Sequence, residues 1–320
     1  MPFIKNAIQK KRAAFLANPN QSYTAPIPVV IVGNISVGGT GKSPMVVALC
    51  KFLIGHGFKP GIISRGHGVK LINPIAVNSD SLASQVGDEP VMLARRTQCP
   101  VVVFPQRAEA IKQLLATTDV DVIVCDDGMQ HYGLNRDIEI AMVDAQRGLG
   151  NGQLLPVGPL REPISRLDSV DYVMSVTDGM TQILSDLNRA VLIASLSSSN
   201  LVSLDGKREL SFIDAFREDQ DWHIMAGIGN PDRFLVTLKA LGLNKPKSVC
   251  WFGDHHNYIE NDIPEHGRVI MTEKDAVKCQ ALAIKNLDIW YLPVSLALPE
   301  AFTATFLQKL QHINNEKRHE

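Results

Sequence analysis

The chain has 320 residues, of which 45 % are hydrophobic and 20 % are charged, and its formal net charge at pH 7 is −1. This composition is that of a globular protein, and the length allows two domains. A net charge near zero provides no overall field that would attract nucleic acid, so we expect no nucleic-acid partner, and the sequence indicates no obligate protein partner. The five cysteines are widely spaced without a Cys-x-x-Cys pair, which favours buried thiols over a disulfide or zinc framework. No apolar run approaches the roughly 18 residues that a membrane span requires.

Residues 1–18 combine apolar and basic side chains at helical spacing. Phe3, Ile8 and Phe15 fall near one face of a helix, whereas Lys10 and the basic residues beside it occupy the rest. Such a helix can lie in a bilayer interface and be attracted by anionic headgroups. The pattern predicts an amphipathic N-terminal helix that is either a membrane-interface anchor or an ordinary surface helix of its own domain.

A run of β-branched residues, 29–32, leads into a glycine-rich turn and then into an apolar segment that begins near Pro44. Such a strand, turn and helix start can surround a phosphate with backbone N–H groups and the positive end of the helix. The lysine would reach the β- and γ-phosphates, and the hydroxyl after it would bind Mg²⁺. The usual pattern has a glycine where this chain has Ser36, and the alternative is a simple glycine turn. The predicted nucleotide-binding residues are Gly38, Gly39, Thr40, Gly41, Lys42 and Ser43.

Segments typical of strands alternate with segments typical of helices along most of the chain. This alternation predicts an α/β fold: a P-loop-type, doubly wound, mostly parallel sheet, with a second, smaller α/β domain. The predicted organisation is an N-terminal helix (1–18), a P-loop nucleotide-binding domain (19–185), an interdomain linker (186–205), the smaller domain (206–292), and a linker with a C-terminal helix directed back to the first domain (293–320).

Carboxylates follow the predicted strands, at the edge where parallel sheets bind ligands. Asp126 and Asp127 close an apolar strand and suit a Mg²⁺ site. Adjacent residues on a strand point to opposite sides, so one would serve the metal and the other the loop or the substrate, and the alternative is a plain Asp-Asp-Gly turn. Asp88 and Glu89 precede a proline, where they either cap a helix or take part in chemistry.

A third polar group, Asp254-His255-His256, ends a strand of the second predicted domain. Neighbouring histidines rarely converge on one metal ion, and no third ligand stands at a suitable spacing. An acid–base role for one histidine, oriented by a carboxylate, is at least as well supported.

These motifs occur in an order that resembles the tetraacyldisaccharide 4′-kinase family, and the resemblance covers nearly the whole chain from about residue 28. Eight ordered motifs are much more specific than the glycine-rich loop alone. They are Gly33-Asn34 with Val37 to Pro44, Ser64-Arg-Gly66, Gly87-Asp-Glu-Pro90, Asp126-Asp-Gly-Met-Gln-His131, Gly158-Pro-Leu-Arg-Glu-Pro163, Ala226-Gly-Ile-Gly-Asn-Pro231, Asp254-His255 and Thr272-Glu-Lys-Asp275.

The resemblance implies a kinase that uses ATP and Mg²⁺ to phosphorylate the 4′-hydroxyl of an acylated glucosamine disaccharide 1-phosphate, a lipid A precursor. It implies a peripheral location at the cytoplasmic face of the inner membrane. The implied roles are nucleotide and Mg²⁺ binding for Thr40, Lys42 and Ser43; base for Asp88, supported by His255; metal binding for Asp126, Asp127 and Glu89; and phosphate or disaccharide contacts for Arg107, Gln130 and Arg161.

Two departures from the family pattern stand out. His67 occupies a position where an aromatic residue is common, and the N-terminal segment is shorter than the membrane-associated segments usual in the family. Two rival interpretations remain. One is a nucleotide-switched targeting or metallochaperone ATPase, although such proteins often carry a lysine near the start of the loop, where this chain has Ser36 and Val37. The other is a kinase of a soluble metabolite, which the basic N-terminal segment disfavours weakly.

Overall fold

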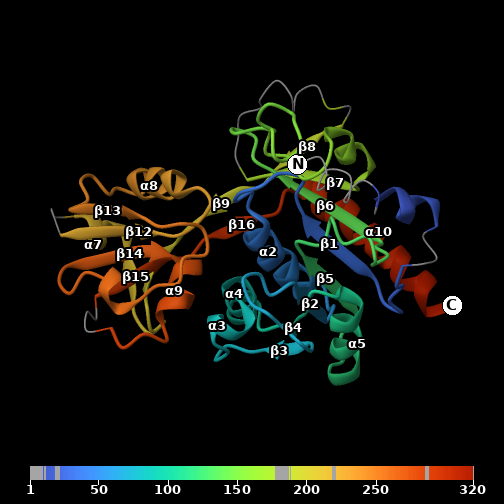
Figure 1. Ribbon diagram of the computed structural model, residues 1–320, viewed down its shortest axis with the longest axis horizontal. Coiled ribbons are helices and arrows are strands. Elements are labelled where there is room, and N and C mark those ends of the chain that lie inside the picture. Colours follow the sequence, from blue (N-terminus) through green and yellow to red (C-terminus); the bar gives the residue numbers. More distant parts are fainter. Residues whose placement is uncertain are drawn as a thin grey trace.

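The computed structural model describes residues 10, 12–18, 22–176, 187, 189–217, 221–284 and 288–319. Two sheets form two domains that lie side by side (Figure 1). The larger sheet has eight strands in the order β3-β4-β2-β5-β1-β6-β7-β8, and all pairs are parallel except β3 with β4. This confirms the predicted α/β fold with a mostly parallel sheet. The strands are β1 (Val29–Gly33), β2 (Pro60–Ser64), β3 (Ile75–Val77), β4 (Val101–Val103), β5 (Val122–Asp126), β6 (Ile138–Val143), β7 (Tyr172–Ser175) and β8 (Val191–Ile193).

Both faces of the larger sheet are covered, which explains why its central strands are continuous runs of valine and isoleucine. One face packs against α2 (Lys42–Gly55), α4 (Asp88–Thr97) and α10 (Glu300–His319). The other packs against α5 (Arg107–Thr117) and the loops around the short 3₁₀ helix η2 (Ile164–Ser169). A single turn of helix, α3 (Ala83–Val86), precedes α4.

The smaller sheet has six strands in the order β11-β10-β15-β14-β12-β13, with β12 to β15 parallel and β10 antiparallel to both its neighbours. Its core includes Trp222, which is fully buried. The strands are β10 (Asn200–Ser203), β11 (Glu209–Ser211), β12 (Trp222–Ala226), β13 (Ser248–Trp251), β14 (Arg268–Thr272) and β15 (Ile289–Leu292); the helices are α7 (Phe212–Phe216), α8 (Pro231–Ala240), the 3₁₀ helix η3 (Glu260–Asp262) and α9 (Glu273–Cys279).

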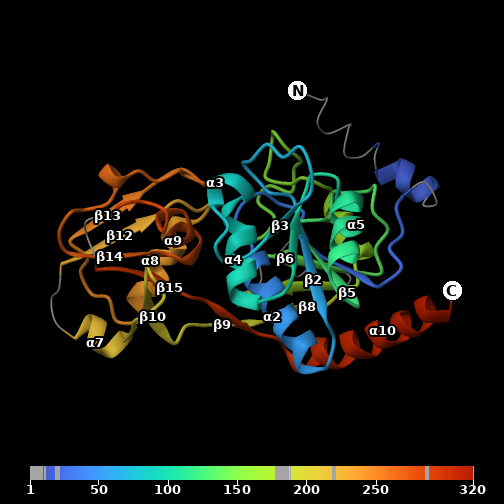
Figure 2. The ribbon, with the colours of Figure 1, turned by 90° about the horizontal axis from the view of Figure 1, so that it is seen from below.

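Two antiparallel strands, β9 (Ser195–Ser197) and β16 (Ser295–Ala297), connect the domains (Figure 1). The linker predicted over 186–205 was therefore too long, because β8 belongs to the larger sheet and β10 to the smaller one. After β16 the chain returns to the larger domain, where α10 lies beside α2 (Figure 2). The rings of Phe52 and Phe306 meet there with their centroids 6.3 Å apart.

Most of the predicted N-terminal helix, residues 1–9 and 11, lies outside the described residues. Residues 12–17 are helical. The Phe15 ring lies 5.6 Å from the ring of Tyr132, and the guanidinium of Arg136 lies 5.1 Å from its centre. Phe15 thus packs on the larger domain, whereas Leu16 is 64 % exposed. Within the part of the chain that the structure describes, no helix has both the length and the apolar character needed to cross a membrane.

Candidate functional site between the domains

The glycine-rich loop joins β1 to α2, and its backbone requires glycine at two points. Gly38 and Gly41 have φ angles of 100° and 87°, in the left-handed region. A Cβ at Gly41 would also stand 2.8 Å from Val176. No side chain caps the N-terminus of α2, so its first N–H groups point to the loop without a side-chain partner. Asn34 stabilises the loop by donating a hydrogen bond to the hydroxyl of Thr40, at 3.2 Å. This arrangement suits a phosphate group.

Two cationic side chains form ion pairs with the same carboxylate beside this loop. The ammonium of Lys42 lies 3.3 Å from Asp127, and the guanidinium of Arg161 lies 3.2 Å from the same carboxylate. Burial would raise the pKa of Asp127, but Lys42 and Arg161 outweigh it and hold the pKa below its ordinary value. Asp127 therefore stays ionised and keeps both cations in position.

Asp126 is the last residue of β5, whereas Asp127 follows the strand with a φ angle of 50°, so the two carboxylates have different partners. Asp126 is 1 % exposed, and one oxygen accepts a hydrogen bond from Ser64 at 3.1 Å. The other oxygen, Oδ1, is buried without a hydrogen-bond partner. Burial, followed by the charges of Glu89 and Asp127, raises the pKa of Asp126 to about 7. A buried carboxylate with an unused oxygen and acidic neighbours would be stabilised by a cation.

The predicted pair Asp88 and His255 comes together across the domain boundary. Nδ1 of His255 lies 3.2 Å from Oδ2 of Asp88, which is 5 % exposed at the start of α4. Burial alone would raise the pKa of Asp88, but the hydrogen bond from His255 and the charge of Lys274 lower it to about 2. The same hydrogen bond raises the pKa of His255 above its ordinary value. Glu89 forms an ion pair with Lys274 at 3.4 Å.

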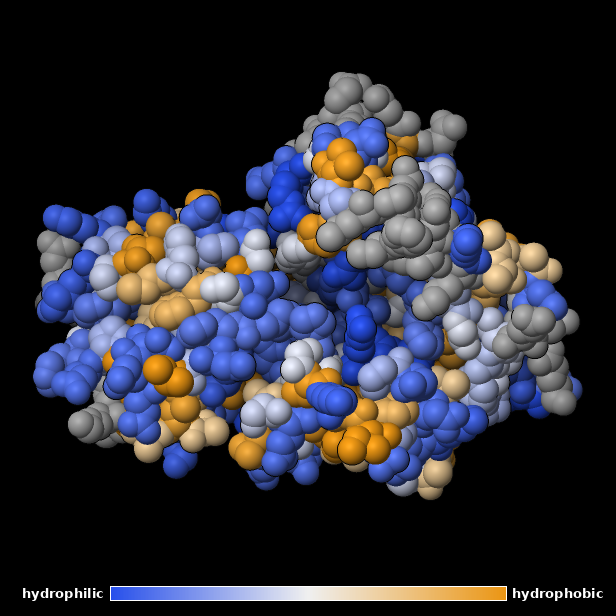
Figure 3. All heavy atoms as spheres, viewed as in Figure 1, coloured by the Kyte–Doolittle hydropathy of each residue, from blue (hydrophilic) through white to orange (hydrophobic). Residues whose placement is uncertain are grey.

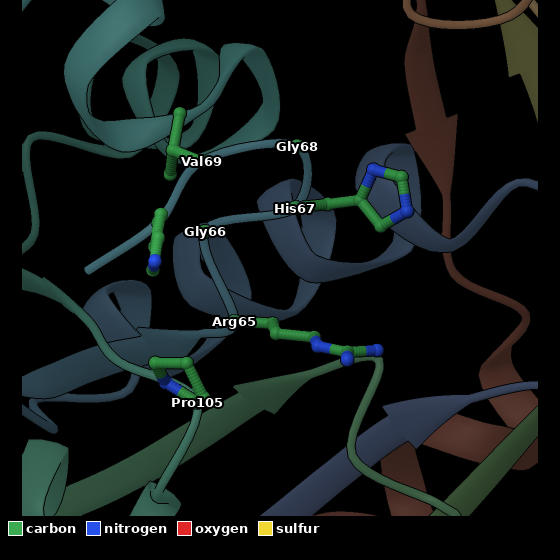
Figure 4. Close-up of a pocket in the computed structure, with 7 residues that line it drawn as sticks. Arg65, Gly66, His67, Gly68, Val69 and Pro105 are labelled. Atoms are coloured by element: carbon green, nitrogen blue, oxygen red, sulfur yellow. The ribbon is translucent and has the colours of Figure 1, made fainter.

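A cavity of about 400 Å³ opens next to this pair, along the loop that follows β2 (Figure 4). The side chains of Arg65 and His67 extend in the same direction from that loop. The His67 ring lies 4.3 Å from the ring of His255, so the cavity and the pair share one wall. The lining is Arg65, Gly66, His67, Gly68, Val69, Lys70 and Pro105. Two cationic side chains among these residues favour an anionic or hydroxyl-rich ligand.

Two of the predicted substrate residues, Arg107 and Gln130, make hydrogen bonds within the protein. Arg107 is 2 % exposed, and its guanidinium donates to the carbonyl oxygens of Phe104 at 2.9 Å and Asp126 at 3.4 Å. Arg107 is thus buried against backbone carbonyl oxygens in this structure, and its contact with phosphate or disaccharide stays a prediction. Gln130 donates to the carbonyl oxygen of Asn34 at 2.9 Å and to the buried Glu162 at 2.8 Å, so it supports the start of the loop.

The smaller domain closes over the loop with its own glycine-rich turn, between β12 and α8. A Cβ at Gly229 would lie 3.4 Å from both Gly38 Cα and Gly39 N. Arg233 reaches across the boundary to Asp144, at 3.8 Å. The surface between the domains is mainly hydrophilic on the face shown in Figure 3. The candidate site is thus built from both domains.

Comparison with known proteins identifies the family of this chain. A family model described as tetraacyldisaccharide-1-P 4′-kinase matches residues 3–311. The chain belongs to this family. Tetraacyldisaccharide 4′-kinase of Shewanella frigidimarina is 44 % identical over 311 residues, covering 96 % of this chain and 89 % of the relative. The same enzyme of Pseudoalteromonas atlantica is 45 % identical, covering 95 % of each chain.

A solved structure shares the fold of this tetraacyldisaccharide-1-P 4′-kinase family member. It is the crystal structure of LpxK from Aquifex aeolicus in complex with ATP, with a TM-score of 0.78 and 24 % identity over 97 % of this chain and 96 % of that one. The family membership makes this chain a phosphotransferase, and it decides against a nucleotide-switched ATPase and against a kinase of a soluble metabolite.

Proposed function

We propose that this chain transfers the γ-phosphoryl group of ATP to the 4′-hydroxyl of a tetraacyldisaccharide 1-phosphate in lipid A biosynthesis. The assignment of roles to residues rests on the contact between Asp88 and His255. The two residues come from different domains and lie beside the loop that holds Lys42. The family membership supports the acceptor, and the phosphate-binding geometry of the loop supports the donor.

The nucleotide occupies the loop from Gly38 to Ser43. Lys42 and Arg161 would exchange part of their contact with Asp127 for contact with the phosphates, whose charge grows at the bridging oxygens as the bond to ADP breaks. Neither cation is more than about a third exposed, so water screens them weakly and their attraction for a phosphate is strong.

The residues fit a Mg²⁺ ion. Asp126 Oδ1 is buried without a partner, and its carboxylate stands among the acidic charges of Glu89 and Asp127. Among the described residues, no group of three or more His, Cys, Asp and Glu side chains could hold a metal, which suits Mg²⁺ because it often uses one or two carboxylates together with phosphates and waters. Ser43 and Asp126 would hold the ion, with Asp127 or Glu89 assisting. When bound, it neutralises charge on the nucleotide phosphates.

The proton of the acceptor hydroxyl passes to Asp88. The 4′-oxygen forms a bond to the γ-phosphorus, the bond from that phosphorus to the β,γ-bridging oxygen breaks, and ADP leaves with the electron pair. A carboxylate with a pKa near 2 is a weak base, but proton transfer can occur late in a loose phosphoryl-transfer transition state. Asp88 therefore orients the hydroxyl first and accepts its proton as the new bond forms.

The polar part of the acceptor lies in the cavity along Arg65, His67 and Lys70, where the two cations can pair with its phosphate. We further propose that residues 1–18 give the enzyme a peripheral contact with the cytoplasmic face of the inner membrane, where an acylated acceptor resides. Their basic and apolar pattern supports this contact.

Acceptor discrimination tests the proposal. Purified protein is incubated with Mg-ATP and, separately, with tetraacyldisaccharide 1-phosphate, with the same lipid lacking its 1-phosphate, and with soluble glucosamine phosphates. Mass spectrometry follows the gain of one phosphate. We expect rapid transfer to the first, slower transfer to the second and none to the soluble sugars. Preferred transfer to a soluble sugar would overturn the proposed acceptor.

A further inference from the structure

A lysine from the smaller domain stands at the centre of the charged groups around Asp88. Lys274, in the first turn of α9, places its ammonium 3.4 Å from His255 Nε2 and 3.4 Å from Glu89. The same nitrogen is 3.9 Å from Asp88 and 3.8 Å from Asp254. Its side chain is only 16 % exposed, so this cluster is largely shielded from water. The sequence motif that contains Lys274 was recognised, but no role was assigned to this residue.

The effect of Lys274 on His255 depends on which of the two ring nitrogens carries a proton. An ammonium has three N–H donors and no acceptor, so a ring nitrogen that faces it at hydrogen-bond distance must present a lone pair. The contact with Lys274 therefore favours a neutral ring with its lone pair on Nε2 and its proton on Nδ1, toward Asp88, and it opposes the hydrogen bond to Asp88 that raises the pKa of His255. In an imidazolium, Nε2 would instead direct a proton at the ammonium.

We propose that Lys274 is a positioning residue that holds His255 in the neutral form protonated on Nδ1, so that His255 donates to Asp88 and leaves it as the proton acceptor. This inference rests on the proposed role of Asp88. It assigns the two residues distinct tasks: while Lys274 is in place, His255 cannot take the proton of the hydroxyl, because one ring nitrogen is already protonated and the other is occupied.

Four groups face the His255 ring and set its charge. Asp88 on α4 and Asp254 on its own loop favour the imidazolium, whereas Lys274 on α9 disfavours it. The His67 ring, from the loop after β2, stacks against it and would also disfavour a second positive charge. Burial of the ring also disfavours the imidazolium, and removing the ammonium at 274 deletes the main charge that opposes the carboxylates. The ring should then become an imidazolium at neutral pH, or move its proton to Nε2.

The test is nitrogen NMR of the full-length protein labelled at its histidine rings, with the His255 signals identified by their absence from His255→Gln. We expect wild type at neutral pH to show His255 protonated on Nδ1 only. Lys274→Met should show an imidazolium or an Nε2 proton, and Lys274→Arg should keep the wild-type pattern. Lys278→Met is the matched control, since Lys278 is 4.0 Å from Asp88 but forms its closer ion pair with Asp275, at 2.9 Å, and it should leave the tautomer unchanged.

A wild-type His255 ring that is protonated on Nε2, or a Lys274→Met spectrum identical to that of wild type, would overturn the inference. The wild-type spectrum alone tests the proposed tautomer, even where a variant fails to fold. Kinetics give the second readout. Lys274→Met should lower kcat on the order of 10²-fold, leave KM for ATP unchanged and move the pH profile to higher pH, with rescue in Lys274→Arg. A changed tautomer with an unchanged kcat would contradict the role of Asp88 in the proposed function rather than the positioning by Lys274.

Discussion

Nδ1 of His255 lies 3.2 Å from Oδ2 of Asp88, although the two residues are 167 positions apart and belong to different domains. This contact requires the domains to be held in their present arrangement. The ion pair between Arg96 on α4 and Glu273 at the start of α9, at 2.6 Å, helps to hold them there. The proposed proton acceptor and the residue proposed to orient it are therefore brought together by tertiary structure alone.

The first prediction is that Asp88 and His255 act as a unit. Asp88→Asn and His255→Ala should each lower kcat by about 10²- to 10⁴-fold with little change in nucleotide binding, because each disables the same proton transfer. The double variant should then be impaired much less than the product of the two losses. Steady-state kinetics and nucleotide titration supply both quantities. Multiplicative losses would mean that the residues act independently and would redirect the search for the base to Asp127.

The second prediction concerns the pH dependence of stability at Asp126. Its folded-state pKa is about 7, against about 4 in an unfolded chain. The folded state binds the proton more tightly, so the free energy of unfolding falls as pH rises from about 4 to about 7. Without Mg²⁺ at pH 8, Asp126→Asn should raise the free energy of unfolding by up to about 4 kcal/mol, and this gain should vanish near pH 4.

Thermal or urea unfolding at several pH values measures this difference. Mg²⁺ with nucleotide should stabilise wild type more than Asp126→Asn, because the variant loses a charged metal ligand. A stability difference that stays constant between pH 4 and pH 8 would show that Asp126 is not the titrating group.

The third prediction separates two arginines. Arg107→Met should lower the free energy of unfolding by about 2 kcal/mol or more, because it leaves the carbonyl oxygens of Phe104 and Asp126 without their donor. Arg161→Met removes a partly exposed partner of Asp127, so it should change stability little but lower kcat/KM for ATP about tenfold or more. Urea unfolding measures the stability of both variants, and steady-state kinetics measures their kcat/KM for ATP and their KM for the acceptor. A folded Arg107→Met enzyme with wild-type stability and a raised KM for the acceptor would support its substrate role.

The fourth prediction concerns the N-terminal segment. Deleting residues 1–18 should weaken binding to vesicles that contain anionic lipid and make the remaining binding less sensitive to salt. Leu16→Ser should weaken it in part, since Leu16 is exposed, whereas transfer to a detergent-dispersed acceptor should persist in both. Vesicle sedimentation measures the effect. Equal binding with and without the segment would make it an ordinary surface helix.

Much of the fold could be predicted because its signals are local. Runs of valine and isoleucine at 29–32 and 122–124 are buried on both faces of the sheet, and glycine with lysine follows the first of them. The linker could not be delimited, because the short strand β9 has exposed side chains and pairs only with β16, which lies about 100 residues later.

The position of Lys42 in a glycine-rich loop could be predicted from local pattern, whereas the base role of Asp88 comes from the family resemblance and stays a prediction, although the structure does place Asp88 beside His255. The phosphate or disaccharide contact of Arg107 is implied by the family resemblance, and sequence alone does not distinguish an arginine that binds an anion from one that is buried against backbone carbonyls. No role for Lys274 follows from the motif Thr272-Glu-Lys-Asp275, in which Thr272 caps α9. The position of Lys274 beside His255 depends on the packing of two domains.

The most direct measurement is the site of the new phosphate. Purified enzyme, Mg-ATP and tetraacyldisaccharide 1-phosphate are incubated, and the product is analysed by mass spectrometry and phosphorus NMR, with Lys42→Ala as the matched control. We predict one new phosphate monoester on the 4′-oxygen with wild type, formed on the order of 10²-fold more slowly or less by the folded control. A phosphate at another hydroxyl, ATP hydrolysis without transfer, or normal transfer by Lys42→Ala would contradict the account.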